Sequence, residues 1–390
     1  MRHRERPVWL AALGDVTDPA TFSGTPYHCL EAGRAAGVFA GGLPLSAAGP
    51  AWRLRRGAWN LAAFLAGGGC GGFQYSDAFL DRLWRRADLG GGDCVRLLNF
   101  FQLFPERSPH PPDVRRWFYI DQTLQQLFAS YTLAQPVPAV RQADAIRRES
   151  AQYLAAEGVV CQSAWAAASV LGDYGVPRER VHVVLPGANF PAAALARWEA
   201  TAPVRPPRRR EGDPLRLVFV GKDWRRKGLD RLLRAVRIAR GQGASIRLLV
   251  IGVERAALPA RLARTASVRW LGVVDKTADP DRFIELLAGA DVGCLLSRAE
   301  AGGISLREFV RLGLPTIAPD VGGAPEYVVP AATTLIPPDA PDAAIAGRLV
   351  ELAFDHDYLE RQRQAARAGR HTAGWNRSVA RLGNVLDAAG

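Results

Sequence analysis

Two glutamates on either side of a glycine turn are the residues of this sequence best placed to do chemistry. Glu300 and Glu308 lie eight positions apart, with Gly302-Gly303 between them and Ser305 opening a helical pattern. The apolar run 290–296, which is typical of a buried strand, comes directly before them. The free N–H groups and the dipole of a helix start attract an anion. The stretch therefore predicts two carboxylates that bind different parts of one polar, anionic ligand.

An ordinary capping box is the competing interpretation of the same residues. Ser305 and Glu308 stand three positions apart, the spacing at which a serine and a glutamate satisfy each other's backbone N–H groups at a helix start. The sequence leaves the cap and the ligand site open as alternatives. We expect the cap to be present in either case, because it would also aim the helix at a bound diphosphate.

A second candidate element is a cluster of cations that follows another expected strand. Four basic side chains occupy six positions: Lys222, Arg225, Arg226 and Lys227. Like charges held this close repel one another unless an anion neutralises them, and a pyrophosphate would do so. A solvated run of charges is the alternative. Two of the chain's three lysines lie here, beside Gly221 and Gly228, which favours the binding site.

These segments resemble the donor-site signature of the retaining glycosyltransferases of family 4 (group 1 type), which have the GT-B fold. The family pattern runs strand, Ser, Glu, a glycine-rich turn, a second Glu eight residues on, Gly-x-Pro, a further strand and Gly-Gly-x-Pro-Glu. The matching parts here are, in order, Ser297, Glu300, Glu308, Gly313-Leu314-Pro315 and Gly322-Gly323-Ala324-Pro325-Glu326. The sequence departs from the pattern at Gly302, where the family usually carries an aromatic residue.

The resemblance is strong over residues 158–330 and looser upstream. Lys222 stands at the arginine position of the family segment Gly-Arg-x-x-x-x-Lys-Gly, and Lys227 stands at its lysine. Gly24 follows the first expected strand, where family members place a paired-glycine turn against the donor phosphates. Val273 lies in a strand-and-loop stretch that is similar to the one whose backbone contacts the nucleobase.

The resemblance also implies a role for each carboxylate. Glu308 would accept hydrogen bonds from the ribose hydroxyls of the donor. Glu300 would hold the hydroxyls of the transferred sugar, together with the backbone of Gly302, Gly303 and Ile304. Family members react on the face from which the leaving group departs, and the diphosphate oxygen takes the proton of the acceptor. Glu300 is therefore not expected to be a covalent nucleophile.

The charge that grows on the leaving diphosphate is assigned in the same way. Lys222 and Lys227 would stabilise it, with help from the helix start at Ser305. Gly221 and Arg226 complete the expected donor-binding set. The resemblance implies neither a metal nor any other cofactor, because the two lysines neutralise the diphosphate.

Residues that bind the acceptor are expected in the first half of the chain. The stretch 119–123 is the candidate, and Asp121 is its acceptor-orienting group or base. Asp121 also directly precedes a helical pattern, so a helix cap is the alternative interpretation.

Strands that alternate with helices must position these residues. In the first half we expect strands at 8–13, 38–40, 95–100, 158–161 and 181–184, and helices at 25–36, 120–130 and 163–174. Between 50 and 92 the pattern is weak, and glycine clusters at 67–72 and 90–92 predict loops. In the second half we expect strands at 215–220, 247–251, 268–270, 292–296, 316–318 and 334–336, and helices at 229–240, 280–288, 306–312 and 343–355.

This alternation is typical of doubly wound parallel sheets. With the resemblance it predicts an α/β protein of the GT-B type, in which two Rossmann-like domains face a central cleft. We expect an acceptor-binding domain at 1–200, a proline- and arginine-rich linker at 201–214 and a nucleotide-sugar domain at 215–372. The last helix, in 373–390, is expected to pack back on the first domain.

Length and charge agree with this organisation. The chain has 390 residues, of which 48% are hydrophobic, enough for about two domains. Its formal net charge of +12 attracts anionic partners such as nucleotide sugars. The basic residues form no stripe interleaved with aromatic residues, so nucleic acid is not an expected partner. The basicity favours equally a peripheral contact with an anionic membrane and a merely basic surface.

The cysteines and the apolar runs exclude several other classes of protein. Five scattered cysteines form no CxxC pair and support neither a zinc site nor a disulfide framework: Cys29, Cys70, Cys94, Cys161 and Cys294. Reduced cysteines are typical of a cytoplasmic protein, so a cytoplasmic location is expected, with membrane association on the cytoplasmic face left open. No apolar run is long enough to span a bilayer, and the run after the basic start is too short for a signal peptide.

The resemblance therefore implies a hexosyltransferase of polysaccharide biosynthesis. Its donor would be a UDP- or GDP-linked sugar, and its acceptor a saccharide or a lipid-linked saccharide. A GT-B-fold nucleotide-sugar epimerase is an alternative that would turn over without an acceptor. A phosphorylase would need a lysine-bound pyridoxal phosphate, and no isolated lysine is suitable. A non-catalytic basic binding or scaffold protein would keep the fold without turnover, but the intact pairs of glutamates and lysines argue against it.

Overall fold

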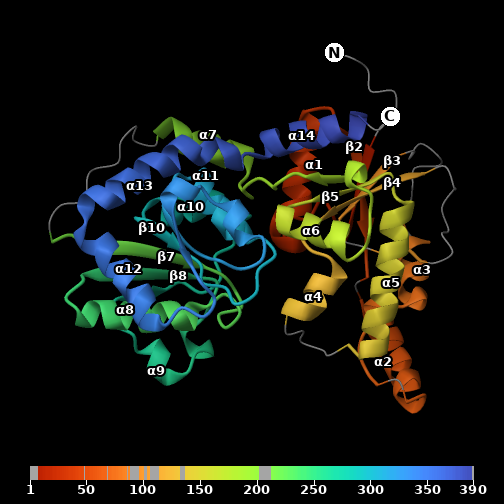
Figure 1. Ribbon diagram of the computed structural model, residues 1–390, viewed down its shortest axis with the longest axis horizontal. Coiled ribbons are helices and arrows are strands. Elements are labelled where there is room, and N and C mark those ends of the chain that lie inside the picture. The colour runs from red at the N-terminus through yellow and green to blue at the C-terminus, as the bar shows by residue number, and fades with distance from the viewer. Residues whose placement is uncertain are drawn as a thin grey trace. The chain divides into compact units, whose positions relative to one another are not determined.

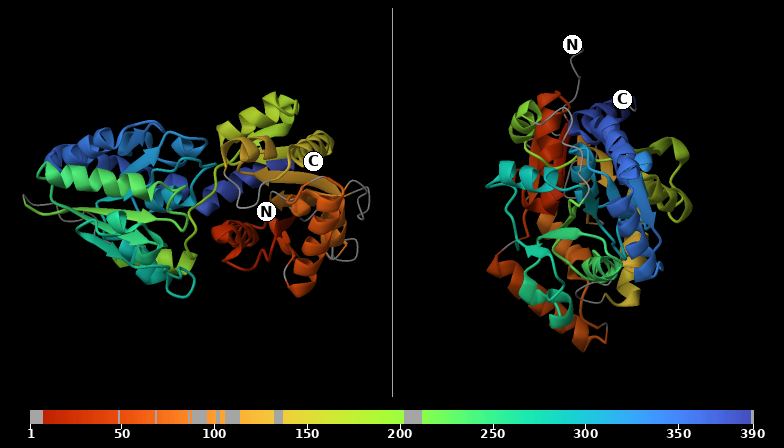
Figure 2. Two further views of the ribbon diagram at one scale, coloured as in Figure 1. Left: turned by 90° about the horizontal axis from the view of Figure 1, so that it is seen from below. Right: turned by 90° about the vertical axis from the view of Figure 1, so that its left-hand side faces the viewer.

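The chain folds into two compact units. The computed structural model describes residues 8–47, 49–67, 69–85, 87, 96–100, 103–105, 114–131, 137–201 and 212–388. One unit comprises Met1–Leu185 with Trp375–Gly390, and the other comprises Pro186–Gly374. In each unit, helices cover both faces of a parallel six-stranded sheet (Figure 1, Figure 2).

The sheet of the first unit has the strand order β2-β1-β3-β4-β5-β6, and all its strand pairs are parallel. Its strands are β1 (Val8–Leu13), β2 (Phe39–Leu45), β3 (Arg96–Phe100), β4 (Arg115–Ile120), β5 (Gly158–Cys161) and β6 (Val181–Val183). Its helices are α1 (Thr25–Ala35), α2 (Pro50–Leu65), α3 (Asp77–Trp84), α4 (Leu124–Ser130), α5 (Ala139–Ala155), α6 (Ala164–Gly172) and α14 (Trp375–Ala388).

Successive residues of a strand point to opposite faces of the sheet, so this unit has two apolar cores. Leu10 of β1 belongs to the core that α1 and α14 cover with Leu30 and Leu382. Its neighbour Ala11 belongs to the core on the other face, which α2, α3, α5 and α6 cover. Helix α14 packs beside α1 (Figure 1).

The sheet of the second unit has the strand order β12-β11-β10-β7-β8-β9 and is also parallel throughout. Its strands are β7 (Leu215–Val220), β8 (Ile246–Ile251), β9 (Val268–Trp270), β10 (Val292–Cys294), β11 (Thr316–Pro319) and β12 (Thr333–Ile336). Its helices are α7 (Ala192–Thr201), α8 (Leu229–Gly241), α9 (Ala260–Ala263), α10 (Pro280–Ala288), α11 (Ile304–Arg311), α12 (Asp342–Phe354) and α13 (His356–Gly369).

The order of strands in this second sheet fixes where a ligand would bind. Counted from β7, the order is that of the dinucleotide-binding fold, with its topological switch point between β7 and β10. The chain leaves β7 toward one edge of the sheet and leaves β10 toward the other. In sheets of this kind, ligands bind beyond the carboxyl ends of the strands, where the two paths diverge.

Several elements of the first unit differ from the prediction. The expected helix at 120–130 begins only at Leu124, because Arg115–Ile120 is a strand, β4. Helix α2 occupies Pro50–Leu65, where the pattern is weak, and α3 and α5 also lie where no helix was predicted. The run 117–120 is apolar throughout, so its periodicity cannot distinguish a strand from a helix. Helix α2 carries apolar residues on two faces, which obscures the amphipathic pattern.

The boundary between the units also lies earlier than residue 200. The segment from Pro186 through α7 belongs to the second unit. Helix α7 packs against α10, and Arg197 and Asp281 form an ion pair of 2.6 Å between these helices. Residues 202–211 of the expected linker and the expected glycine loop at 90–92 lie outside the described residues. Among the described helices, none is both long enough and apolar enough to cross a membrane.

Candidate active site

The two loops that carry the predicted site lie side by side at the switch point of the second unit. Loop 221–228 follows β7 and loop 295–303 follows β10, and these two strands are neighbours in the sheet. The loops are joined by their backbones, since the N–H of Arg298 donates to the carbonyl of Arg226 over 2.8 Å. The structure therefore places the loop of predicted cations beside the loop that carries Glu300.

Glycine permits this close approach at one position. Gly228 has a φ of +70°, which L side chains rarely adopt. A β-carbon there would lie 1.9 Å from the carbonyl oxygen of Leu296 in the neighbouring loop. Gly228 is also the residue before α8, so it ends the cationic loop and starts the helix.

Glu300 is buried and tied to this cationic loop through one oxygen. The ammonium of Lys227 contacts Oε2 of Glu300, and a guanidinium nitrogen of Arg226 lies 3.4 Å from the same oxygen. The hydroxyl of Ser297 donates to Oε2 as well, over 2.9 Å. Burial alone would raise the pKa of Glu300, but Lys227 and Arg226 more than offset it and hold the pKa below its usual value. Glu300 is therefore a carboxylate at neutral pH.

Arg226 and Lys222, two further cations of the loop, differ in their surroundings. Arg226 also donates to the carbonyl of Ala299 over 3.0 Å, so it helps to hold the glutamate loop in place. Lys222 is exposed, and the described residues give it no hydrogen bond or ion pair. The pKa of Asp275 is lowered mainly by N–H donation from Thr277 and in smaller part by the charge of Lys222.

Glu308 has a lysine of its own. Glu308 is 2% exposed, and its Oε1 lies 2.8 Å from the ammonium of Lys276, which is in the loop after β9. Sequence reasoning did not include Lys276 in the site. The available signal was rarity, because Lys276 is the only lysine of the chain outside the cationic loop.

The expected capping box is absent, and that prediction was wrong. Helix α11 begins at Ile304, and Gly303 takes the cap position with a φ of +91°. No side chain caps the helix, because Ser305 already lies inside it and Glu308 pairs with Lys276 instead. The hydroxyl oxygen of Ser305 is buried, and no described residue forms a hydrogen bond with it. The helix start therefore carries a polar atom that the fold leaves unsatisfied.

The departure from the family pattern at Gly302 has a steric cause. A β-carbon at Gly302 would lie 2.1 Å from Cζ of Tyr327. Tyr327 is buried and ends the short 3₁₀ helix Ala324–Tyr327. Its ring occupies the space beside the turn, so no larger residue fits at Gly302 without a rearrangement.

Two further predicted donor residues lie at the same edge of the sheet. Gly221 directly follows β7, and its N–H donates to the carbonyl of Ile251 over 3.0 Å. Val273 is 62% exposed in the loop after β9. Gly272, next to it, has a φ of +61°, and a β-carbon there would lie 1.9 Å from Oε1 of Glu254.

Helix α11 also fixes the ends of the second unit. Arg307 is buried, and its Nε donates to the carbonyl of Pro186 over 2.9 Å. Another nitrogen of the same guanidinium donates to the carbonyl of Thr372. Beside them, the N–H of Ala188 donates to the carbonyl of Ala373 over 2.8 Å.

The remaining predicted residues belong to the first unit. Gly24 precedes α1 with a φ of +89°. Phe22 and Ser23 before it also have positive φ, so two non-glycine residues form the turn where the family has its second glycine. Asp121 follows β4 but does not cap α4, because Thr123 forms a capping box with Gln126. The helix-cap interpretation of Asp121 was therefore wrong, and its role toward an acceptor stays a prediction.

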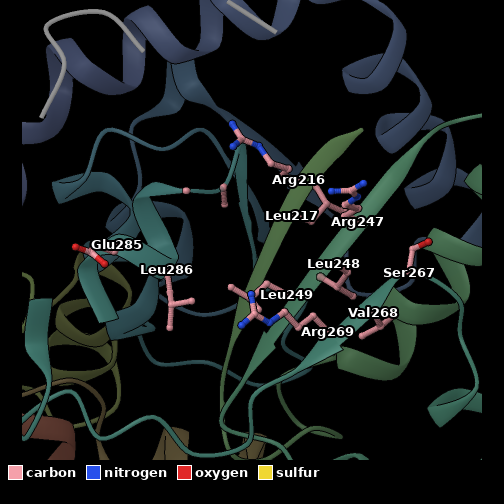
Figure 3. A pocket seen from close by; sticks show the side chains of 12 residues that line it. Arg216, Leu217, Arg247, Leu248, Leu249, Ser267, Val268, Arg269, Glu285 and Leu286 are labelled. Carbon is pink, nitrogen blue, oxygen red and sulfur yellow. The ribbon is translucent and has the colours of Figure 1, made fainter. Parts of the chain in front are cut away.

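A pocket of about 530 Å³ lies elsewhere in the second unit (Figure 3). It is lined by residues at the starts of β7 and β8, among them Arg216 and Arg247, and by the end of α10. It contains none of the predicted site residues, which follow the carboxyl ends of the strands. Within the described ranges, no group of three or more His, Cys, Asp or Glu side chains is arranged to hold a metal ion.

Comparisons with known sequences cover the part of the chain that carries this site. Residues 214–355 match the family model described as "Glycosyl transferases group 1". A D-inositol 3-phosphate glycosyltransferase of Nocardia farcinica is 30% identical over 237 residues, which are 57% of this chain and 50% of that protein. Another, of Thermobispora bispora, is 28% identical over 269 residues, 65% of this chain and 60% of that protein. The match thus spans about half of the first relative's length.

Solved structures match nearly the whole chain at low identity. Sucrose-phosphate synthase of Thermosynechococcus elongatus has a TM-score of 0.64 and 15% identity, and the match covers 99% of this chain and 100% of that one. HepE of Anabaena, in complex with UDP and glucose, has a TM-score of 0.62 and 12% identity, with 98% and 100% covered. WaaG, a glycosyltransferase involved in lipopolysaccharide biosynthesis, has a TM-score of 0.61 and 15% identity, with 97% and 99% covered. The chain thus has the GT-B fold, and its residues 214–355 match the model of the group 1 glycosyltransferases.

Proposed function

We propose that this chain is a retaining glycosyltransferase. It would move a hexosyl sugar from a UDP- or GDP-linked donor to a saccharide or lipid-linked saccharide acceptor. One observation carries the proposal: two buried carboxylates, each paired with its own lysine, lie at the switch point of the sheet in the family-matching domain. The pairs are Glu300 with Lys227 and Glu308 with Lys276.

The start of α11 supports an anionic donor. The hydroxyl of Ser305 is buried without a partner, which costs free energy unless a ligand supplies one. The cap position is a glycine, so no side chain competes for the first N–H groups of the helix. A diphosphate would satisfy both the hydroxyl and these N–H groups, and the helix dipole would favour its charge.

Glu300 is placed to accept a hydrogen bond from a sugar. Its contacts with Lys227, Arg226 and Ser297 all involve Oε2. Among the described residues none donates to Oε1, which leaves that oxygen for a hydroxyl of the transferred sugar. A carboxylate with a lowered pKa and several donors on it is a weak nucleophile. We therefore assign Glu300 to sugar binding and not to a covalent intermediate.

The leaving diphosphate would be stabilised by lysines. An ammonium has three N–H donors, so Lys227 can keep its contact with Glu300 and still donate to a phosphate oxygen. Lys222 is exposed two positions after β7 and would add a second charge. We propose that these charges act without a metal, and that the diphosphate oxygen takes the proton of the acceptor hydroxyl. Glu308 would accept from the ribose hydroxyls.

A thermal-shift panel of nucleotide sugars tests the donor. UDP- or GDP-sugars should raise the melting temperature of the wild type, and Glu308→Ala should reduce the shift. Lys227→Ala should depress turnover more than binding. Wild-type activity in both variants would contradict the site, and activity that disappears with a metal chelator would contradict the metal-free part.

The acceptor assay separates the alternatives. A transferase needs an acceptor, and D-inositol 3-phosphate, which appears in the names of the relatives, is one candidate to include. Conversion of the nucleotide sugar without any acceptor would instead indicate an epimerase. The absence of any thermal shift across the panel would favour a non-catalytic binding protein. Asp121→Asn should lower turnover if Asp121 orients the acceptor.

A further inference from the structure

Helix α2 turns large apolar side chains toward solvent. Leu54 is 75% exposed, Leu61 60%, Phe64 63% and Leu65 76%. Positions 54, 61 and 65 are separated by seven and four residues, so they share one face of the helix, and position 64 adjoins it. Single exposed apolar residues are common, but several on one helical face form a patch that indicates an interaction surface.

The fold does not need this outer face, because the opposite face already anchors the helix. Trp52 is 6% exposed and packs on Phe79 with ring centroids 5.1 Å apart. Trp59 packs on Phe73 at 5.6 Å, and the guanidinium of Arg141 lies 4.2 Å from the ring of Trp59. The two tryptophans hold α2 on the core of the first unit, and the leucines stand away from it.

The charges on α2 are all positive. Arg53, Arg55 and Arg56 are exposed, and none has a carboxylate partner among the described residues. The helix contains no acidic residue, and the sequence has none between Glu31 and Asp77. A surface that combines exposed leucines with arginines lacking a carboxylate partner is complementary to a bilayer, which has an apolar interior and can have an anionic surface.

We propose that α2 docks on the surface of an anionic lipid bilayer. The helix would lie in the interfacial plane, with Leu54, Leu61 and Leu65 in the boundary between headgroups and acyl chains. Arg53 and Arg55, which flank this face on its two sides, would contact lipid phosphates. Figure 1 shows α2 at one end of the first unit, beside the end of α5. The inference goes beyond the proposed function, since binding to lipid does not require that a sugar be transferred.

A second copy of the chain is the other occupant that an apolar face could take. A two-fold contact would place the same patch of each copy against the other. The three arginines of one helix would then face those of its partner, with no carboxylate on either helix to neutralise them. An anionic bilayer removes this repulsion, so the charge pattern favours lipid.

Vesicle co-sedimentation of the full chain tests the proposal. Wild type should bind vesicles of phosphatidylcholine with phosphatidylglycerol, less so as salt rises, and should bind phosphatidylcholine alone weakly. Replacing Leu54, Leu61 and Leu65 together with serine should weaken binding by roughly a hundredfold. Replacing Arg53, Arg55 and Arg56 with glutamine should weaken it by a similar factor, about a hundredfold, and remove its salt dependence.

Controls keep the test specific. Val140→Ser removes an apolar side chain that is 83% exposed on α5, and it should leave vesicle binding unchanged. All variants change exposed residues, so their melting temperatures and their shifts with nucleotide sugars should match those of the wild type. These shifts also separate a failure of this inference from a failure of the proposed function.

Three results would overturn the inference. The first is a wild type that does not sediment with anionic vesicles. The second is a triple serine variant that binds them as well as the wild type does. The third is a lipid-free dimer, seen by sedimentation velocity, that the serine substitutions dissociate, since this would make α2 an interface between copies.

Discussion

The ring of Tyr327 fills the space where a side chain at position 302 would lie. A β-carbon at Gly302 would be 2.1 Å from Cζ of Tyr327, closer than two carbons can approach. The donor turn is therefore shaped by a residue that stands 25 positions later in the chain. The glycine and the tyrosine form one packing unit, and neither can be changed independently.

We expect Gly302→Ala to destabilise the protein by about 1–3 kcal/mol, because it overpacks a buried contact. Gly347→Ala is the matched control, since nothing lies within 4 Å of its added β-carbon and it is inside α12. That control should be neutral or stabilising by up to about 1 kcal/mol. Urea unfolding measures both. The effect at 302 should shrink in a Tyr327→Ala background, and equal effects of the two alanines would contradict the packing argument.

Ser305→Ala should separate folding from binding. The hydroxyl of Ser305 has no partner in the fold, so its removal should leave the melting temperature unchanged or slightly higher. If the hydroxyl receives a diphosphate, the same variant should bind UDP or GDP about tenfold more weakly, the value of roughly one hydrogen bond to a charged group. Titration calorimetry gives the affinity. A lower melting temperature together with unchanged nucleotide affinity would reverse the assignment.

Lys227→Met should affect both stability and turnover. It leaves the buried Glu300 with only Arg226 and Ser297, so the protein should lose up to about 3 kcal/mol. The pKa of Glu300 is lowered in the fold, so its contribution to stability is present above the usual value near 4.5 and is lost as the pH falls through the lowered pKa. Turnover should fall about a hundredfold or more. Arg348→Met, which breaks an exposed ion pair with Glu351 on α12, should leave turnover unchanged.

Lys276→Met tests the carboxylate that is assigned to the ribose. Without Lys276, Glu308 is a buried charge with no ion-pair partner, and its position should no longer be fixed. We expect the KM for the nucleotide sugar to rise about tenfold with little change in kcat, because the interaction concerns binding and not the developing charge. Steady-state kinetics over a range of donor concentrations measures this split. A fall in kcat at constant KM would place Lys276 with the leaving group instead.

The first unit should lose stability as the pH rises toward neutrality. Burial raises the pKa of Glu149 to about 7, although Tyr174, the N–H of Leu124 and Tyr153 all donate to it. A raised pKa means that the stabilisation is complete below the usual value of 4.5 and is lost as the pH rises through about 7. The loss is at most about 3 kcal/mol.

Glu149→Gln should flatten this slope in a series of unfolding curves between pH 4.5 and 7.5. The exposed Glu31 provides the control, because Glu31→Gln changes the same chemical group on the surface of α1. A Glu149→Gln variant that keeps the wild-type slope would show that another group titrates.

The second unit was predictable because its central strands are largely buried. Leu215–Val220 is a nearly continuous apolar run, and its bounds agree with the prediction. In β4 the run of aromatic residues before Asp121 was equally compatible with a helix, so a strand was missed. Helix α2 was not predicted because its solvent-exposed apolar residues obscured the amphipathic pattern of the helix.

Within the site, the residue types were predictable and the partners were not. Glu300 and Lys227 were selected from neighbouring motifs, and the structure joins them. Lys276 meets Glu308 across 32 positions, through a contact that depends on the order of strands in the sheet. The capping box failed because a left-handed glycine, Gly303, took the cap position, and the spacing of two side chains carries no information on backbone conformation.

Arg307, the neighbour of Glu308, links α11 to both points at which the chain crosses between the units. The chain enters the second unit at Pro186 and leaves it after Gly374, and Arg307 holds a carbonyl close to each crossing. Arg307 and Glu308 are adjacent in α11. The helical turn that carries the carboxylate assigned to the nucleotide therefore also contacts the backbone near both crossings. A twist of α11 on binding would be transmitted directly to both backbones, and slower amide exchange at Ala188 on addition of nucleotide would detect it.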